Sequence, residues 1–367
     1  MLILIGAGLL VCAYTWLGYP ALIGLLSRLR SSGVETKGEW SPSITACVAV
    51  HNGAAHIEAK LGSLLSQDYP PDLVEVLVYA DGCTDDTVTL VAKVAARDPR
   101  VKLVEGTKRA GKPTALNHMR RIAKGEVLVM TDVRQPLSRN SFRSLVCALG
   151  PETVGCVSGN LVLVGLTGAS FYWKYENWIR SKEARFRSMV GVTGPLYAVR
   201  RADLPELPSD TILDDMWIPM RLRLSGKRLL FAPDAEARDD AFDDEREFSR
   251  KARTLAGNYQ LFARLPRLLI PGLNPSWFET FSHKILRLIC PWVLVALPVL
   301  TAMELASLDP PAWLSWFAAI QVLFLIAAIA GPRAGRATAL ARSFVVLNAA
   351  AIVGLWRFLS GRQRITW

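Results

Sequence analysis

A chain of 367 residues, of which 51% are hydrophobic, is too long and too apolar for one ordinary soluble domain. Its net charge is 43 − 32 = +11, which in a soluble protein would favour nucleic acid as a partner. The sequence carries no nucleic-acid recognition motif, so the anionic inner leaflet of a membrane and a phosphorylated ligand explain the cations better. The six cysteines form no CxxC pair, so we expect reduced structural thiols.

The first apolar segment, Leu2–Leu26, contains no charged side chain and is long enough to cross a bilayer as a helix. Arg28 and Arg30 follow it, and the positive-inside rule then places the downstream chain in the cytoplasm. A cleaved signal peptide is the alternative, but no Lys or Arg precedes the apolar run. We therefore expect a retained transmembrane anchor over residues 1–27.

Residues 40–260 form the next predicted domain, in which short apolar runs alternate with amphipathic segments. The apolar runs predict buried strands over Ile44–Val50, Val74–Tyr79, Val101–Val104 and Glu126–Met130. The amphipathic segments predict helices over Ala54–Ser66, Thr84–Ala96 and Pro113–Ile122. This alternation predicts an α/β fold with a mainly parallel sheet and helices on both faces.

Polar residues stand where three of the predicted strands end. These residues are His51, Asp81 and Asp132. Ligands of open α/β sheets bind at the carboxyl ends of the strands, so we expect the three side chains to gather along one edge. The GxGxxG fingerprint of dinucleotide-binding folds is absent from this region.

Two adjacent carboxylates, Asp214 and Asp215, end a short apolar run, and Arg250 and Arg253 follow further along the chain. A carboxylate acts as a general base when it lies within hydrogen-bond reach of a proton. Arginine keeps its charge and grips phosphate oxygens in a fork. The combination favours removal of a proton from a hydroxyl beside a leaving diphosphate. A solvated acidic turn followed by a basic helix face is the alternative from these residues alone.

The C-terminal third is apolar again. We expect an interface segment over residues 261–284 and transmembrane or interface helices over residues 285–360. Leu288–Met303 and Ala312–Gly331 are long enough, with their flanks, to span a bilayer. Ser343–Trp356 has a short uncharged core, so it either crosses the membrane or lies in its interface. The sequence therefore predicts two to three C-terminal transmembrane helices.

Six segments resemble, in order, the motifs of membrane-anchored glycosyltransferases of family 2. These proteins have the GT-A fold, and the family includes relatives of cellulose and hyaluronan synthases. They are VAVHNGAAHIEAKLGSLLSQDYP, YADGCTDDT, GKPTALN, TDVRQ, LDDM and RKAR. In the family these places hold the first strand and helix, an Asp-Gly-Ser-Thr-Asp turn, a Gly-Lys-x-x-Ala-Leu-Asn segment, an Asp-x-Asp metal motif, a Glu-Asp base motif and Gln-x-x-Arg-Trp. The resemblance covers nearly all of the chain.

For the donor, the resemblance implies that Asp81 holds the nucleobase and that Lys112 contacts the diphosphate. Arg250 and Arg253 take the places of the family's Gln and Arg, and Arg253 is expected to contact the diphosphate as well. Thr254 stands where the family has Trp, a residue that seats the acceptor sugar in polysaccharide synthases. This departure weakens a processive, polymer-extruding interpretation.

For catalysis, the resemblance implies that Asp215 is the general base and that Asp214 tunes it or holds the loop. A like charge next door raises the pKa of one carboxylate, which suits a base near neutral pH. One base without an enzyme nucleophile implies a single displacement and inversion at the anomeric carbon.

The metal motif keeps its first carboxylate, Asp132, but has Arg134 at the place of the second. Asp132 would bind a divalent cation, Mg²⁺ or Mn²⁺, directly or through water, or else the ribose hydroxyls. In one alternative Arg134 partly replaces the cation by pairing with a diphosphate oxygen or with Asp132. In the other Arg134 points away, and the metal is held by fewer protein ligands together with the substrate phosphates.

The expected activity is inverting transfer of a sugar from an NDP-sugar to a saccharide or lipid-linked acceptor. Among the NDP-sugars, a UDP-sugar is the expected donor. The expected place is the cytoplasmic face of the inner membrane, in envelope or exopolysaccharide synthesis. With so few membrane spans, a separate exporter or synthase partner is expected. The alternative is a non-catalytic membrane subunit of a polysaccharide synthase complex.

Overall fold

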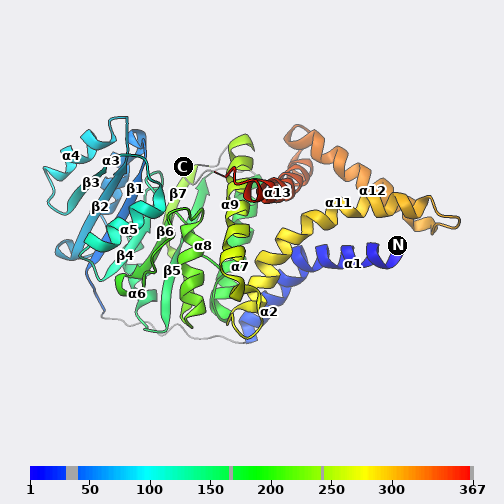
Figure 1. Ribbon diagram of the computed structural model, residues 1–367, viewed down its shortest axis with the longest axis horizontal. Coiled ribbons are helices and arrows are strands. Elements are labelled where there is room, and N and C mark those ends of the chain that lie inside the picture. The colour runs from blue at the N-terminus through cyan, green and yellow to red at the C-terminus, as the bar shows by residue number, and fades with distance from the viewer. Residues whose placement is uncertain (30–39, 165–167, 241–243, 364–367) are drawn as a thin grey trace.

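The computed structural model describes residues 1–29, 40–164, 168–240 and 244–363, and its sheet has seven strands (Figure 1). The strands are β1 (Ile44–Val50), β2 (Val74–Asp81), β3 (Val101–Gly106), β4 (Val127–Thr131), β5 (Val154–Val164), β6 (Leu196–Arg200) and β7 (Arg228–Asp240). Their spatial order is β3-β2-β1-β4-β6-β5-β7, and only the pairs that involve β6 are antiparallel. The predicted α/β fold with a mainly parallel sheet is confirmed.

Alternate side chains of the strands supply two hydrophobic cores, one on each face of the sheet. On β1, Ile44, Ala46 and Val48 are buried with α3, α4 and α6, whereas Cys47 and Ala49 are buried with α5, α8 and α9 on the other face. These helices are α3 (Ala54–Leu65), α4 (Thr87–Ala95), α5 (Lys112–Ile122), α6 (Ser141–Leu149), α8 (Asp214–Leu224) and α9 (Asp244–Arg264). Both faces are covered, as near-continuous apolar strands require.

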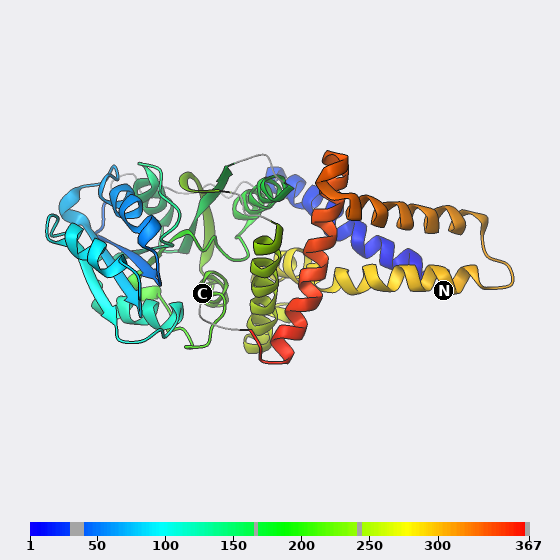
Figure 2. The same cartoon turned by 90° about the horizontal axis from the view of Figure 1, so that it is seen from above.

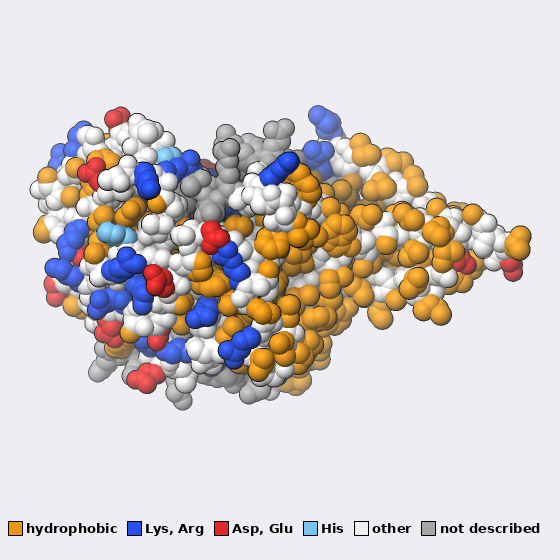
Figure 3. Space-filling model, viewed as in Figure 1, with side chains coloured by type: hydrophobic (Ala, Val, Ile, Leu, Met, Phe, Trp, Pro, Cys, Tyr) orange, Lys and Arg blue, Asp and Glu red, His pale blue; other side chains and the backbone are white. Residues whose placement is uncertain are grey.

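Four helical runs within the described residues are long and apolar enough to cross a membrane: Leu2–Leu29, Trp277–Leu305, Ala312–Ala334 and Arg336–Leu359. Their helices are α1 (Leu2–Ala13), α2 (Tyr19–Leu29), α10 (Trp277–Glu279), α11 (Leu286–Leu305), α12 (Ala312–Ala330) and α13 (Arg336–Leu359). α1, α11 and α12 project away from the sheet domain, and apolar side chains cover this projection (Figures 1 and 3). The predicted N-terminal and C-terminal apolar helices are confirmed, while the domain boundaries, including the interface segment 261–284, stay predictions.

The last of these helices, α13, does not run beside its neighbour. It turns back from α12 at a steep angle and packs along α9 of the sheet domain (Figure 2). The contact is close at Gly354, where an added Cβ would lie 2.9 Å from the backbone N of Ala256 and 3.0 Å from the backbone O of Ala252. Of the two alternatives for Ser343–Trp356, this packing favours a helix that lies in the interface.

Helix α7 (Gly168–Phe186) joins the sheet domain to the N-terminal helices. Its Ile179 and Phe186 are buried against Tyr19 and Ile23 of α2. The Trp173 indole Nε1 donates a hydrogen bond to the Leu161 carbonyl of β5 at 2.6 Å. The helix therefore holds the first apolar helix and the sheet in one packed unit.

Candidate active site

Lys112, the first residue of α5, connects two of the predicted acidic segments. Its Nζ lies 2.9 Å from Asp132 Oδ1, just after β4, and 3.2 Å from Asp214 Oδ1, at the start of α8. Burial would lower the pKa of Lys112, but the carboxylates of Asp132 and Asp214 more than offset this and raise it. The lysine therefore stays charged between two carboxylates.

Asp132 is held in its ionised form by the same cluster. Burial would raise its pKa, but Lys112, Lys60 and Arg253 together lower it. Its side chain keeps 37% exposure, so the carboxylate remains accessible to solvent. Among the described residues no group of three His, Cys, Asp or Glu side chains could hold a metal ion. As a metal ligand Asp132 therefore supplies one carboxylate, and the remaining ligands have to come from substrate or water.

Asp215 follows Asp214 in the first turn of α8. Burial and the neighbouring Asp214 charge raise the pKa of Asp215 to about 6, although Lys112 acts in the opposite direction. Asp214 itself accepts a hydrogen bond from Tyr197 Oη at 2.9 Å, in addition to its Lys112 contact. The pair is thus asymmetric: Asp214 is fixed by two partners, and Asp215 is the carboxylate that titrates near neutral pH.

The segment before β6 forms a wall beside Asp215. The Val192 amide donates to the Asp215 carbonyl at 3.0 Å. A Cβ added at Gly194 would lie 3.1 Å from Asp215 Oδ2, so the segment passes close to the carboxylate because Gly194 has no side chain.

Asp81 ends β2 and is 1% exposed. Its carboxylate accepts hydrogen bonds from the backbone amides of Ala110 at 2.7 Å and Gly111 at 2.8 Å. The His51 ring contacts the Asp81 carbonyl through Nδ1 at 2.8 Å. Asp81 therefore holds the loop that presents Lys112, and its contact with a nucleobase stays a prediction.

Arg134 pairs with Asp239 and not with Asp132, so the Asp132 pairing offered in the first alternative is wrong, while its pairing with a diphosphate oxygen stays a prediction. Its guanidinium forms an ion pair with Asp239, at the end of β7, and Gln135 Nε2 also donates to Asp239 Oδ2 at 2.7 Å. The side chain of Asp239 on β7 is 8% exposed, so Asp239 offers a better-matched partner than Asp132, which Lys112 already neutralises. A contact of Arg134 with substrate stays a prediction.

The two arginines of α9 lie in different surroundings. Arg253 Nη2 donates to the Ile212 carbonyl at 3.1 Å. Burial raises the pKa of Asp132, and the charge of Arg253 helps those of Lys112 and Lys60, which have larger effects, to lower it. Arg250 is exposed. Arg253 is therefore brought to the acidic cluster, and the substrate contact of Arg250 stays a prediction.

Sequence reasoning missed Lys60, which is fully buried on α3. Its Nζ donates to Thr131 Oγ1 and to the Gln135 carbonyl, both at 2.6 Å, and so it secures both ends of the loop that carries Asp132. Burial lowers the pKa of Lys60 to about 7, although Asp132 partly opposes this. The available signal was its spacing, because a lysine three residues after Ile57 lies on the buried stripe of that helix.

Comparisons with known proteins show what the chain is similar to. The family model of Glycosyl transferase family 2 matches residues 45–201. The chain is 25% identical over 221 residues to a beta-monoglucosyldiacylglycerol synthase of Nostoc sp., which covers 57% of this chain and 47% of the synthase. It is 27% identical over 228 residues to an N-acetylglucosaminyltransferase of Mesorhizobium japonicum, which covers 56% and 53%. The chain spans about half the length of the curated relatives it matches.

A solved structure resembles the chain over nearly its whole length. The mannosyltransferase PcManGT from Pyrobaculum calidifontis, in complex with GDP-Man and Mn²⁺, superposes with a TM-score of 0.77 and 27% sequence identity. The match covers 98% of this chain and 99% of that protein. The sheet domain and the apolar helices are therefore similar as one arrangement.

Proposed function

We propose that the chain, whose residues 45–201 match the family model of Glycosyl transferase family 2, is an inverting enzyme that transfers a sugar from an NDP-sugar to a membrane-associated acceptor. The observation that carries this proposal is a cluster of charged side chains. In it Lys112 bridges Asp132 and Asp214, and Asp215, which follows Asp214 in the chain, has a pKa of about 6. A cation for the diphosphate and a base for the acceptor then stand side by side.

The mechanism follows from the charges. Asp215 accepts the proton of the acceptor oxygen, that oxygen attacks the anomeric carbon, and the bond from this carbon to the diphosphate breaks. The diphosphate leaves with the electron pair, and Lys112 and Arg253 stabilise its charge. One displacement with one base inverts the anomeric configuration. A divalent cation at Asp132, when bound, would supply further positive charge to the diphosphate oxygens.

The donor is best assigned by a panel of NDP-sugars. UDP-sugars are the first candidates on the sequence, and GDP-mannose belongs in the panel because the similar mannosyltransferase was solved with it. Release of nucleotide by the purified protein in detergent identifies the donor. Absence of release with every donor and acceptor would favour the alternative, a non-catalytic subunit of a synthase complex.

Replacing Asp215 by Asn removes the base but keeps the size of the side chain. We expect transfer to fall at least about a hundredfold, because a positioned base contributes on that order. Donor affinity, measured by calorimetry or fluorescence, should stay close to that of the wild type. Asp72→Asn, an exposed position in the loop before β2, is the matched control and should keep full activity. Substantial turnover by Asp215→Asn would exclude the assignment of the base.

The cellular setting is part of the proposal. The four apolar runs and the cations that follow Leu2–Leu26 support an inner-membrane protein whose catalytic domain faces the cytoplasm, where NDP-sugars are made. Envelope or exopolysaccharide synthesis is the process that such a membrane-bound transferase would serve. A separate exporter or synthase partner would then carry the product across the membrane.

A further inference from the structure

Polar side chains on one face of α3 hold the loop that follows β4. Ser63 Oγ accepts a hydrogen bond from the Leu137 amide at 3.2 Å. Lys60 stands three residues earlier, on the same face of the helix, and its Nζ donates to Thr131 Oγ1 and to the Gln135 carbonyl, both at 2.6 Å. These two acceptors stand at either end of the segment that carries the metal motif. The contacts of Lys60 therefore lie directly behind the candidate active site.

A second hydrogen bond continues from Thr131 to the segment before β6. Thr131 Oγ1 accepts from Lys60 and donates to the Pro195 carbonyl at 2.8 Å. The Asp132 amide also donates to the Pro195 carbonyl, at 3.4 Å. Donors and acceptors point the same way from Lys60 through Thr131 to Pro195, so each bond polarises and strengthens the next. We call this chain of hydrogen bonds the Lys60 relay.

Pro195 belongs to residues 192–195, which we call the wall segment because they lie against the proposed base. The Val192 amide donates to the Asp215 carbonyl at 3.0 Å, and a Cβ added at Gly194 would lie 3.1 Å from Asp215 Oδ2. The position of the wall segment is therefore felt directly at the carboxylate. Through the Lys60 relay, this segment is connected to the loop that follows β4.

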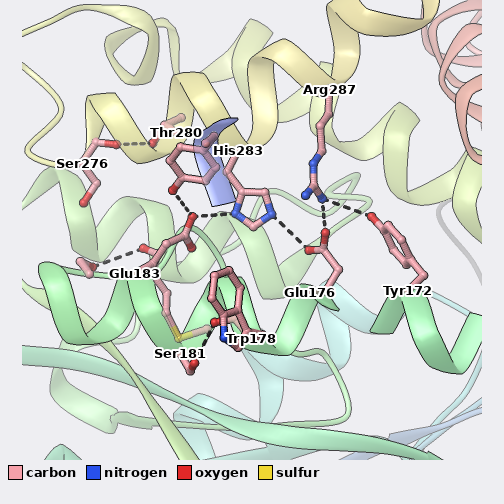
Figure 4. A network of polar contacts seen from close by, with 12 residues as sticks. Tyr172, Glu176, Trp178, Ser181, Glu183, Ser276, Thr280, His283 and Arg287 are labelled. Carbon is pink, nitrogen blue, oxygen red and sulfur yellow. Dashed lines mark hydrogen bonds and ion pairs between the residues drawn. The ribbon is translucent and has the colours of Figure 1, made fainter. Parts of the chain in front are cut away.

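Two basic side chains packed between α7 and the helical run Trp277–Leu305 show how burial is commonly compensated. In the network of Figure 4, His283 Nε2 lies 3.1 Å from Glu176 Oε2, and Nδ1 lies 2.7 Å from Glu183 Oε1. Arg287 pairs with the same Glu176. Lys60 is fully buried as well, but both of its acceptors are uncharged oxygens. A basic group buried in this way is costly, so its presence calls for a reason.

A simpler side chain can hold a loop without this cost, as the Ser63 hydroxyl does. The amine of Lys60 differs because it has more than one N–H, and it therefore donates to both ends of the metal-motif segment at once. An amine that has lost its proton still has two N–H donors, so both hydrogen bonds persist in either form. What the lysine adds is the simultaneous hold on the two ends of this segment.

We propose that Lys60 is a positioning residue of the transfer reaction. Through Thr131 it fixes the loop that follows β4, which carries Asp132 on the donor side, relative to the wall segment beside the base. This inference rests on the proposed function and adds a residue that touches neither the donor nor the acceptor. Without the Lys60 relay the loop and the wall segment can separate, and donor and base then lose the alignment that direct attack requires.

Two substitutions at Thr131 test the middle of the relay. Thr131→Val removes the hydroxyl but keeps nearly the same shape, and Lys60 still holds the Gln135 end of the loop. We expect kcat to fall about tenfold while KM for the donor stays within about twofold, because the wall segment is released and the loop is not. Thr131→Ser keeps the hydroxyl, and as the matched control it should retain kcat within about twofold of the wild type.

Lys60→Met removes both hydrogen bonds with a side chain of similar length. Both ends of the loop are then released, so kcat should fall at least about tenfold and KM for the donor should rise about threefold or more. Ser63→Ala removes the contact of the same helix face with Leu137. As the matched control it should change neither constant by more than about twofold. Both constants are measured by nucleotide release in detergent.

The double variant of Lys60→Met and Thr131→Val shows whether the two residues act together. Within one relay the second change has little left to remove, so kcat should stay within about twofold of that of Lys60→Met. Independent effects would multiply to about a hundredfold loss, and this result would overturn the proposal. If thermal unfolding shows that Lys60→Met does not fold, the Thr131 variants decide alone, and equal kcat in Thr131→Val and Thr131→Ser would overturn it.

These outcomes are distinct from those that test the proposed function. A wild-type protein that transfers sugar, with kcat unchanged in Thr131→Val and Lys60→Met, would refute the relay and leave the transferase assignment standing. A wild-type protein that releases nucleotide from no donor would refute the transferase assignment, and with it this role of Lys60.

Discussion

Lys112 stands at the centre of the site because its ammonium lies between the carboxylates of Asp132, just after β4, and Asp214, at the start of α8. A cation in that place keeps Asp132 ionised and forms an ion pair with Asp214, and it is the group that we propose to bind the diphosphate. At the neighbouring Asp215, burial and the Asp214 charge outweigh the opposing charge of Lys112, so its pKa is raised. Adjacent residues with the same side chain thus have different chemistry.

The pH dependence of transfer follows from the Asp215 pKa of about 6, which burial and Asp214 raise. A general base works only when it is deprotonated, so kcat/KM should rise with pH up to about 6 and then level off. Asp214→Asn removes one cause of the raised pKa and should move this limb to lower pH. The profile is measured with saturating acceptor. An acidic limb that stays in place in Asp214→Asn would contradict the coupling.

Metal dependence can be predicted from the partner of Arg134. Its guanidinium forms an ion pair with Asp239, so we predict that Arg134 does not take the place of a divalent cation at Asp132. We expect EDTA to abolish transfer and Mn²⁺ or Mg²⁺ to restore it. Arg134→Ala should keep the same metal requirement, although the loss of the ion pair lowers stability. Transfer that persists in EDTA would instead support a cationic role for Arg134.

At the scale of elements, α13 supports the helix that carries Arg253. Because Gly354 lies against backbone atoms of α9, a larger residue there cannot be accommodated by side-chain movement alone.

Gly354→Val should therefore separate α13 from α9 and destabilise the protein by about 1–3 kcal/mol. The shift of Arg253 should also raise KM for the donor, because this arginine is proposed to contact the diphosphate. Thermal unfolding and donor titration in detergent measure the two effects. Gly6→Val is the matched control, since a Cβ at Gly6 on α1 meets nothing within 4 Å. Wild-type donor KM in Gly354→Val would contradict this role of α13.

Helices and strands with a clear pattern of apolar residues could be predicted from the sequence, whereas the pairing of residues far apart in the chain could not. The run Ile44–Val50 gave β1 with the observed ends, because a buried parallel strand is continuously apolar. The antiparallel β6 has no such local signature, since its direction depends on β4 and β5 on either side. The Arg134–Asp239 pair joins segments far apart in the chain, so spacing could not reveal it. Motif order brought Lys112, Asp132 and Asp214 to attention, but only the fold shows that one ammonium contacts both carboxylates.

For the whole molecule, the shape predicts which parts of the chain lie on opposite sides of a membrane. The connection between α11 and α12 lies at the end of the projection furthest from the sheet domain (Figure 1), and Leu308 within it is fully exposed. If the domain is cytoplasmic, this connection must emerge on the opposite side.

Leu308→Cys should react with a membrane-impermeant maleimide in intact cells, above the labelling of the wild type with its six native cysteines. Arg97→Cys, at an exposed position of the sheet domain, should react only after the cells are permeabilised. The physical reason is that the reagent cannot cross the bilayer. Labelling of Arg97→Cys in intact cells would reverse the orientation.

The return of α13 onto α9 has a consequence for how the protein is made. Between these two helices the chain must first complete α11 and α12, the two apolar helices of the projection. α13 can therefore pack against α9 only after α11 and α12 have been synthesised and inserted into the bilayer. Until then α13 does not support Arg253 of α9, so we expect a growing or uninserted chain to lack a firmly held Arg253 beside the acidic cluster.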